Sequence, residues 1–286
     1  MRISNLLRNC VAFVAVRKSD GSFEVRGTGF FIAKPLDRAA AAPVGDGLHR
    51  LNGMYLYFVT ARHVIEGARS LGADQVWVRT DVPGSEPRFL PAMLSDFTFH
   101  PDSTVDYAVV HTEGNLLDGI RVLPWIYSGG RLGDSFVLDS AVGVGSPVSI
   151  IGLFRHHYGA QRNLPIVRTG NVAAMAEEPV NTRMGLMEAI LVEARSIGGL
   201  SGSPVFVHTR PSFVPANPEA IAGIQLLGLM HGHFDEVFDA GPQTRERVNV
   251  GIGIVAPVSK LREIMTLPQV LEREAETAGR LSRGEQ

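Results

Sequence analysis

The chain has 286 residues, of which 45% are hydrophobic, and its 27 basic and 29 acidic side chains leave a net charge of −2. This composition is typical of a globular protein with a sizeable core, large enough for one all-β unit or two small domains. Because the charges balance, we expect no nucleic acid as a partner. The single cysteine, Cys10, excludes an internal disulfide framework and is compatible with a reducing compartment.

The first apolar run, Val11–Val16, follows two arginines and is followed at once by Arg17 and Lys18. It is shorter than the roughly 7–15 residues of a signal-peptide core, and charges stand where a cleavage site would lie. We therefore predict a first β-strand and a cytoplasmic protein, with secretion as the alternative. Because no run reaches the ~18 apolar residues of a membrane span, we expect no membrane as a partner.

From Val11 to Val258, short apolar segments alternate with Gly, Pro, Asp and Asn, a pattern that favours a sandwich or barrel over a βαβ protein. The predicted strands are residues 11–16, 29–33, 54–60, 75–79, 107–111, 147–153, 164–173, 189–194, 204–207, 222–230 and 248–257. Four longer stretches are predicted as loops, namely 34–53, 178–186, 208–219 and 233–247. Such loops often carry specificity or regulation or cover a cleft, and the alternative for each is a tolerated surface insertion. After Val258, apolar residues recur with a helical period, which predicts a C-terminal helix interrupted near Pro268.

The segment Gly-Leu-Ser-Gly-Ser-Pro at 199–204 contains a candidate nucleophile, Ser201. A serine hydroxyl attacks only when a base takes its proton, and the flanking glycines permit backbone geometry that side chains would obstruct. Ser203 and Ser196 are weaker candidates. An α/β-hydrolase elbow is disfavoured because its fifth residue should be glycine and its acid and histidine should follow the serine.

Two upstream segments supply partners for this serine. His63 closes Thr-Ala-Arg-His at the end of an apolar run, and Asp106 precedes the apolar segment 107–110. A histidine base needs a carboxylate that holds its tautomer and stabilises the imidazolium. Asp102 is the competing carboxylate, but its sequence, His-Pro-Asp-Ser, is typical of a turn.

In the order His, Asp, Ser, these segments resemble the chymotrypsin-like serine peptidases, and most closely the bacterial HtrA/DegP and staphylococcal glutamyl endopeptidase branches. The resemblance extends over about residues 11–265 and includes four further segments, at 26–30, 148–152, 169–172 and 251–257. One departure is Arg62, which stands where many relatives have alanine.

The resemblance implies an all-β fold of two six-stranded antiparallel β-barrels with a C-terminal helix. Residues 1–130 would form the barrel that carries His and Asp, residues 131–258 the barrel that carries Ser, and residues 259–286 the helix and tail. The linker would lie near 123–140. No segment of the size of a PDZ domain follows, so we expect that module to be absent.

The resemblance also implies a serine endopeptidase. Ser201 would attack, His63 would move the proton, Asp106 would orient the histidine, and the amides of Gly199 and Ser201 would hold the oxyanion. The resemblance further implies protein or peptide substrates and no cofactor. We expect no metal, because one cysteine and scattered histidines do not form a zinc pattern.

The primary specificity pocket is predicted around Arg195, Met230, His231 and Gly232. Related peptidases place a histidine in this late strand to read an acidic or amide side chain, so we predict Glu, Asp or Gln at P1. The pattern here is one residue longer, and a one-residue slip reverses which face a side chain takes. The alternative is an outward His231 and a small apolar pocket lined by Met230 or Leu229.

Two other functions remain open. The first is a partner-activated, zymogen-like binding or signalling module with little basal activity, which would need a regulatory protein partner. The second is an esterase with little peptidase activity. Spontaneous labelling of Ser201 by a fluorophosphonate separates the first from a constitutive peptidase, and a comparison of ester and amide substrates tests the second.

Overall fold

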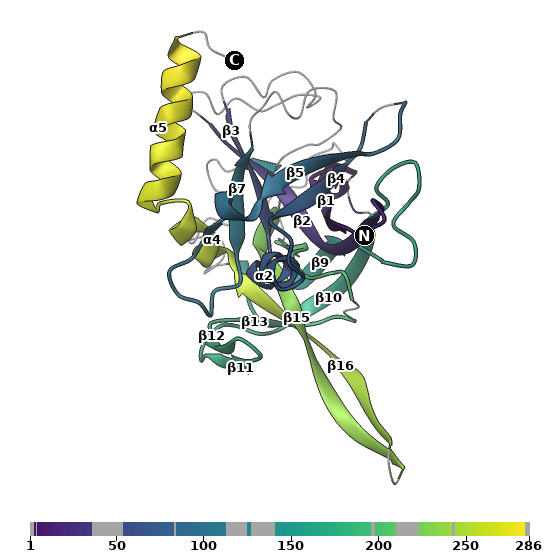
Figure 1. The fold of residues 1–286 in the computed structure, drawn as a ribbon. Helices are drawn as coiled ribbons and strands as arrows, with labels where there is room; N and C mark the ends of the chain where they lie inside the picture. Colours follow the sequence, from purple (N-terminus) through teal and green to yellow (C-terminus); the bar gives the residue numbers. More distant parts are fainter. Residues whose placement is uncertain are drawn as a thin grey trace.

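The structure is a computed structural model that describes residues 3, 5–35, 54–82, 84–112, 125–126, 141–195, 198–209, 223–241 and 244–283. Two β units lie against each other, and two helices end the chain (Figure 1). Within these ranges no helix combines the length and the apolar character needed to cross a bilayer.

The N-terminal unit is a sheet with the strand order β5-β4-β1-β2-β3-β7-β6, with β8 paired to β2. After the short helix α1 (Asn5–Asn9), its strands are β1 (Val11–Arg17), β2 (Phe23–Pro35), β3 (Met54–Thr60), β4 (Gln75–Thr80), β5 (Arg88–Met93), β6 (Thr98–Phe99), β7 (Ala108–Thr112) and β8 (Trp125–Ile126). Helix α2 (Arg62–Ser70) follows β3, and a 3-10 turn, η2 (Leu94–Asp96), follows β5.

Strand β1 is an unbroken apolar run because both of its faces are buried. Phe13 packs into the core cluster shared by the two β units, whereas Val14 packs into a second cluster with Phe31 and Phe58. The strand predicted at residues 11–16 is therefore a central strand of this sheet.

The C-terminal unit is a closed six-stranded barrel with the order β10-β13-β16-β15-β14-β9. Its strands are β9 (Pro147–Gly152), β10 (Ile166–Ala174), β13 (Ile190–Glu193), β14 (Pro204–His208), β15 (Ile224–Gly241) and β16 (Thr244–Pro257). Its interior is filled by one apolar cluster that includes Ile150, Val192, Val205 and Met230.

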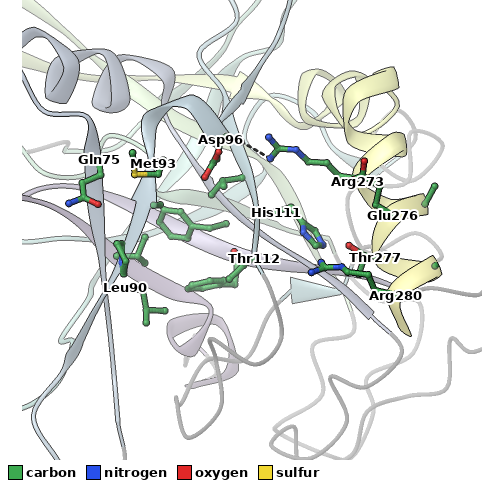
Figure 2. Close-up of a pocket in the computed structure, with 18 of the residues that line it drawn as sticks. Gln75, Leu90, Met93, Asp96, His111, Thr112, Arg273, Glu276, Thr277 and Arg280 are labelled. Carbon is green, nitrogen blue, oxygen red and sulfur yellow. Dashed lines mark hydrogen bonds between the residues drawn. The ribbon is translucent and has the colours of Figure 1, made fainter. Parts of the chain in front are cut away.

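The expected all-β class and C-terminal helix are confirmed by the closed barrel, the second β unit and the terminal helices α4 (Val258–Ile264) and α5 (Pro268–Ser282). One expected feature differs. In the described residues the N-terminal sheet does not close, because its end strands β5 and β6 do not pair with each other. On that open side a cavity of about 1140 Å³ lies between the sheet, at Gln75 and Leu90, and α5, at Arg273 and Arg280 (Figure 2).

Two stretches predicted as loops are β hairpins. Residues 178–186 lie largely in the small hairpin of β11 (Val180–Thr182) and β12 (Gly185–Met187). Residues 233–241 and 244–247 extend β15 and β16 into a ribbon that projects from the barrel (Figure 1). The ribbon is rich in charged residues, so apolar periodicity could not reveal it, and backbone pairing decides its structure. Strand β5 was missed for a similar reason, since it contains Pro91 and only one buried residue.

Part of the predicted organisation lies outside the described residues. Of the predicted loops 34–53 and 208–219, residues 36–53 and 210–219 are not described. The same is true of most of the predicted linker near 123–140. The start of α5 at Pro268 agrees with the interruption expected there.

Candidate active site

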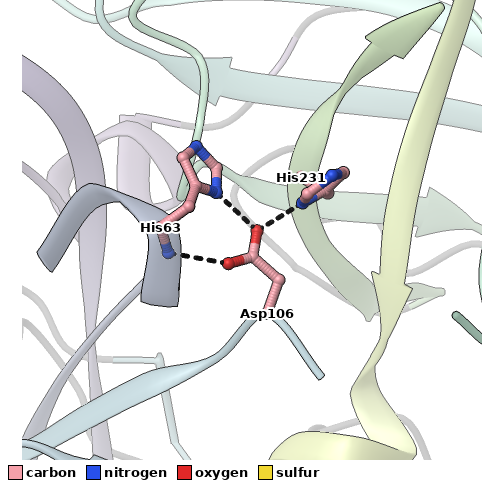
Figure 3. Close-up of side chains that lie close together, drawn as sticks. All are labelled: His63, Asp106 and His231. Carbon is pink, nitrogen blue, oxygen red and sulfur yellow. Dashed lines mark hydrogen bonds and ion pairs between the residues drawn. The ribbon is translucent and has the colours of Figure 1, made fainter. Parts of the chain in front are cut away.

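His63 and Asp106 are brought together where β3 ends and α2 begins. His63 lies in the first turn of α2, and its backbone N–H donates to Asp106 Oδ1 at 2.9 Å. Its imidazole Nδ1 contacts Asp106 Oδ2 at 2.7 Å (Figure 3). The carboxylate thus satisfies an amide at the helix N-terminus and holds the ring at the same time.

Asp106 has no exposed surface. Burial by itself would raise the pKa of its carboxyl group. The charge of His63 and the hydrogen bonds from His231 and His63 outweigh burial and lower that pKa to about 2. The next residue, Tyr107, donates from its hydroxyl to the carbonyl of Ala256 at 3.1 Å. This bond fastens the start of β7 to β16 and fixes the carboxylate between the two β units.

His63 keeps 36% of its side chain exposed. Burial acts to lower its pKa, but attraction to Asp106, the hydrogen bond to that carboxylate and the charge of Glu66 together raise it. With Nδ1 engaged as donor to Asp106, the neutral ring has Nε2 as its basic nitrogen. The pair has the geometry of a general base with an orienting acid.

Ser201 lies in the turn that leads into β14. Its carbonyl accepts a hydrogen bond from the Thr28 amide at 2.9 Å, and Gly202 N–H donates to the Met230 carbonyl at 2.8 Å. Gly202 has φ +84°, and a Cβ on it would lie 2.0 Å from the Thr28 carbonyl oxygen. Only glycine fits there.

The Ser201 hydroxyl donates to the carbonyl of His231 at 3.3 Å. Ser201 and His63, both in described segments, are not hydrogen-bonded to each other. Catalytic hydrogen bonds in unliganded enzymes are often long or misaligned. In the structure, His63 is therefore hydrogen-bonded to Asp106, whereas the Ser201 hydroxyl donates to the His231 carbonyl.

Gly199, expected to supply an oxyanion amide, has φ +105°. Its carbonyl accepts a hydrogen bond from Thr28 Oγ1 at 2.7 Å, and Thr28 Oγ1 accepts one from the Leu153 amide at 2.9 Å. The fully buried Thr28 therefore joins β2, the serine turn and the end of β9. Sequence reasoning missed Thr28, because a threonine beside glycines in an early strand carries no functional signal.

The four residues predicted for the specificity pocket have different surroundings. Arg195 is exposed beyond β13, and Met230 is fully buried, with its Cε near Gly253 in the barrel interior. His231 bonds through Nδ1 to Asp106 Oδ2 at 2.5 Å, and its side chain is 10% exposed. Gly232 follows it in β15. The partner of His231 is thus the carboxylate, an arrangement that the sequence did not indicate.

His63, Asp106 and His231 each offer a ligand atom within 4.8 Å of the others, and such a set can hold a metal ion. Two donors on one tetrahedral zinc, each bonded at ~2.0 Å, lie about 3.3 Å apart. The two N···O distances here are 2.7 Å and 2.5 Å. This geometry fits hydrogen-bonded histidines better than ligands around an ion.

No protein-family model matches the sequence, and no curated protein sequence matches it significantly. Among solved structures, the apo MamO protease domain from Magnetospirillum magneticum is 14% identical, covers 90% of this chain and 96% of its own, and has a TM-score of 0.49.

The inactive form of Rv3671c protease is 14% identical, covers 91% of this chain and 89% of its own, and has a TM-score of 0.45. A serine-to-alanine mutant of Rv3671c from M. tuberculosis H37Rv, also an inactive form, is 15% identical, covers 92% and 91% of the two chains, and has a TM-score of 0.43. At this level of likeness, no activity is transferred from these proteins to this chain.

Proposed function

We propose that this protein is a serine endopeptidase that cleaves peptide bonds through an acyl-enzyme intermediate. Ser201 Oγ attacks the scissile carbonyl while His63 Nε2 takes its proton. The same nitrogen returns that proton to the leaving amine, and water then hydrolyses the ester. The observation that carries the proposal is that Asp106 bonds to both the backbone N–H and the imidazole Nδ1 of His63. Because Nδ1 is occupied by this bond, Nε2 is the ring nitrogen that can act as the base.

The oxyanion that forms during attack needs donors fixed in advance. We assign this role to the amides of Gly199 and Ser201. Two features support the assignment: the positive φ of Gly199 and the hydrogen bond from Thr28 to its carbonyl. Neither amide donates to another group in the described part of the chain.

The deciding experiment is labelling of the purified protein with a fluorophosphonate, read by intact mass. One adduct is expected on wild type. Ser201→Ala should abolish it and His63→Ala should reduce it at least a hundredfold, since a base contributes about 10²–10⁴. Ser203→Ala is the matched control, because Ser203 is buried two residues away, and it should still be labelled. Labelling of Ser201→Ala equal to wild type would overturn the assignment.

A preference for an acidic or amide side chain at P1 belongs to the same proposal. Its support is the cationic Arg195, six residues before Ser201 and exposed. Peptides that differ only at P1, with Glu, Gln, Ala, Leu or Arg, test it. Fastest cleavage after Ala or Leu would contradict the preference and favour a small apolar pocket.

A second candidate function is a resting, partner-activated form of the same fold with little basal activity. It is favoured by one observation, the hydrogen bond of the Ser201 hydroxyl to the His231 carbonyl in place of one to His63. In this form a regulatory protein would move the hydroxyl onto the base. Absence of labelling on wild type, with labelling restored by a binding partner, would select this candidate.

A further inference from the structure

His231 occupies a β-bulge beside the candidate active site. In the pairing of β15 with β16, Met230 lies opposite Val255 and Gly232 lies opposite Ile254, which leaves His231 as the extra residue between them. Bulges redirect a side chain and are common next to active sites.

The bulge is held against the serine turn. Met230 exchanges two backbone hydrogen bonds with that turn, accepting from Gly202 N–H and donating to the Ser203 carbonyl, both at 2.8 Å. The residue that follows Met230 therefore has a fixed position relative to Ser201. Its own carbonyl accepts the Ser201 hydroxyl at 3.3 Å.

The side chain of His231 reaches the third member of the site. Its Nδ1 bonds to Asp106 Oδ2, the same oxygen that contacts His63 Nδ1, and the two imidazoles meet edge-on with ring centroids 5.3 Å apart (Figure 3). A carboxylate oxygen has two lone pairs and accepts both bonds. His231 thus contacts Ser201 with its backbone and Asp106 with its side chain.

We propose that His231 is a positioning residue of this site, a second imidazole that shares Asp106 with His63 and sets how strongly the carboxylate acts on the base. The proposal rests on the proposed function. The hydrogen bond from His231 fixes the Asp106 carboxylate and withdraws part of its negative charge. It therefore lowers the proton affinity of His63. Because its Nδ1 is bonded to Asp106, we assign His231 to the positioning of this carboxylate and not to recognition of the P1 side chain.

The charged and titratable groups around His231 determine the sign of this effect. Asp106 faces it from the segment before β7 and His63 faces it from α2, while Glu66 acts on His63 from the next turn of α2. The hydrogen bond from His231 to Asp106 therefore lowers the proton affinity of His63, and removal of His231 raises it.

The test compares His231→Phe, which keeps a ring but removes the donor, with His231→Asn, which keeps a neutral donor. His233→Asn is the matched control, since His233 lies two residues along β15 and pairs with Asp235 instead. The primary readout is the titration of His63 in the intact protein, followed by NMR of histidine-labelled samples. It requires no substrate and no activity.

We expect His231→Phe to move the His63 titration midpoint upward by about 0.5 pH or more, His231→Asn to restore most of the wild-type value, and His233→Asn to leave it unchanged. Where wild type is labelled by a fluorophosphonate, His231→Phe should also slow labelling on the order of tenfold at high pH, because the carboxylate is less well fixed.

An unchanged His63 midpoint in a folded His231→Phe would overturn the proposal, whatever the labelling result. If wild type is not labelled at all, the proposed function fails instead, and the NMR titration still decides whether His231 controls Asp106. If His231→Phe does not fold, the comparison of His231→Asn with wild type decides: two strongly deshielded Nδ1 protons are expected in wild type and one in the Asn variant. A single such proton in wild type would refute the shared carboxylate.

Discussion

Thr28 Oγ1 donates a hydrogen bond to the carbonyl of Gly199, 171 positions away in the sequence, at 2.7 Å. The same hydroxyl accepts the amide hydrogen of Leu153, and the Thr28 amide donates to the Ser201 carbonyl. One residue of the N-terminal sheet therefore fixes the turn that carries the candidate nucleophile. The turn depends for its shape on the other β unit.

Thr28→Val keeps the size of the side chain but removes its hydroxyl. We expect fluorophosphonate labelling of Ser201 to slow by about tenfold or more, because the Gly199 carbonyl and the Leu153 amide each lose their partner. Leaving these buried groups unpaired should also lower the free energy of unfolding by about 1–3 kcal/mol. Labelling kinetics and urea denaturation measure the two effects.

Thr28→Ser is the control for this substitution, since it retains the hydroxyl and loses only a methyl group. It should keep most of the wild-type labelling rate. Equal rates for the Val and Ser variants would show that the hydroxyl does not shape the turn.

The pH dependence of labelling follows from His63. Only the neutral imidazole accepts the serine proton, and the pairing with Asp106 raises the pKa of His63. Labelling should therefore rise with pH and reach half its maximum above ~6.5, the value of an unperturbed histidine. A midpoint at or below that value would contradict the ion pair.

We expect that His63 does not destabilise the fold as the pH falls. A histidine whose pKa is raised in the folded state adds stability that is fully present below its unfolded pKa and is lost as the pH rises through the folded pKa. Hence His63 stabilises the fold most where labelling is slowest. Circular dichroism at each pH of the series checks that the protein stays folded.

Gly202→Ala should abolish labelling. The residue combines φ +84° with a Cβ position 2.0 Å from the backbone oxygen of Thr28, so the turn must move away from β2. Gly143→Ala is the control outside the site, because a Cβ there meets nothing within 4 Å. Intact mass after fluorophosphonate treatment should show an adduct on the control alone, and an adduct on both would refute this account of the turn.

Glu274 joins α5 to the N-terminal sheet. Its carboxylate accepts hydrogen bonds from Lys34 at 2.8 Å and from the Tyr57 hydroxyl at 2.5 Å. Glu274→Ala removes this shared acceptor and should lower the free energy of unfolding by about 1–3 kcal/mol. Glu272→Ala, an exposed position on the same helix, should change it by less than about 0.5 kcal/mol. Equal losses for the two variants would show that the pairing with the sheet is unimportant.

The sequence by itself determined the all-β class and singled out His63 and Asp106, which the structure brings into contact. Runs such as 11–16 and 54–60 are apolar because the strands are buried, and this signal is local. His63 and Asp106 stood out because each adjoins a strand within a short recognisable segment. The ribbon formed by 233–241 and 244–247 could not be predicted because its polar residues carry no such period.

Only the tertiary structure decided which groups act on one another. Thr28 and Gly199 meet because backbone pairing brings β2 to the serine turn, and no local pattern encodes that distance. The partner of His231 depends on a one-residue bulge, since a strand reverses its faces at every position. The sequence therefore singled out His63, Asp106 and Ser201 but not Thr28. Long-range pairing decided that His231 bonds to the same carboxylate as His63 and that the Ser201 hydroxyl donates to the His231 carbonyl.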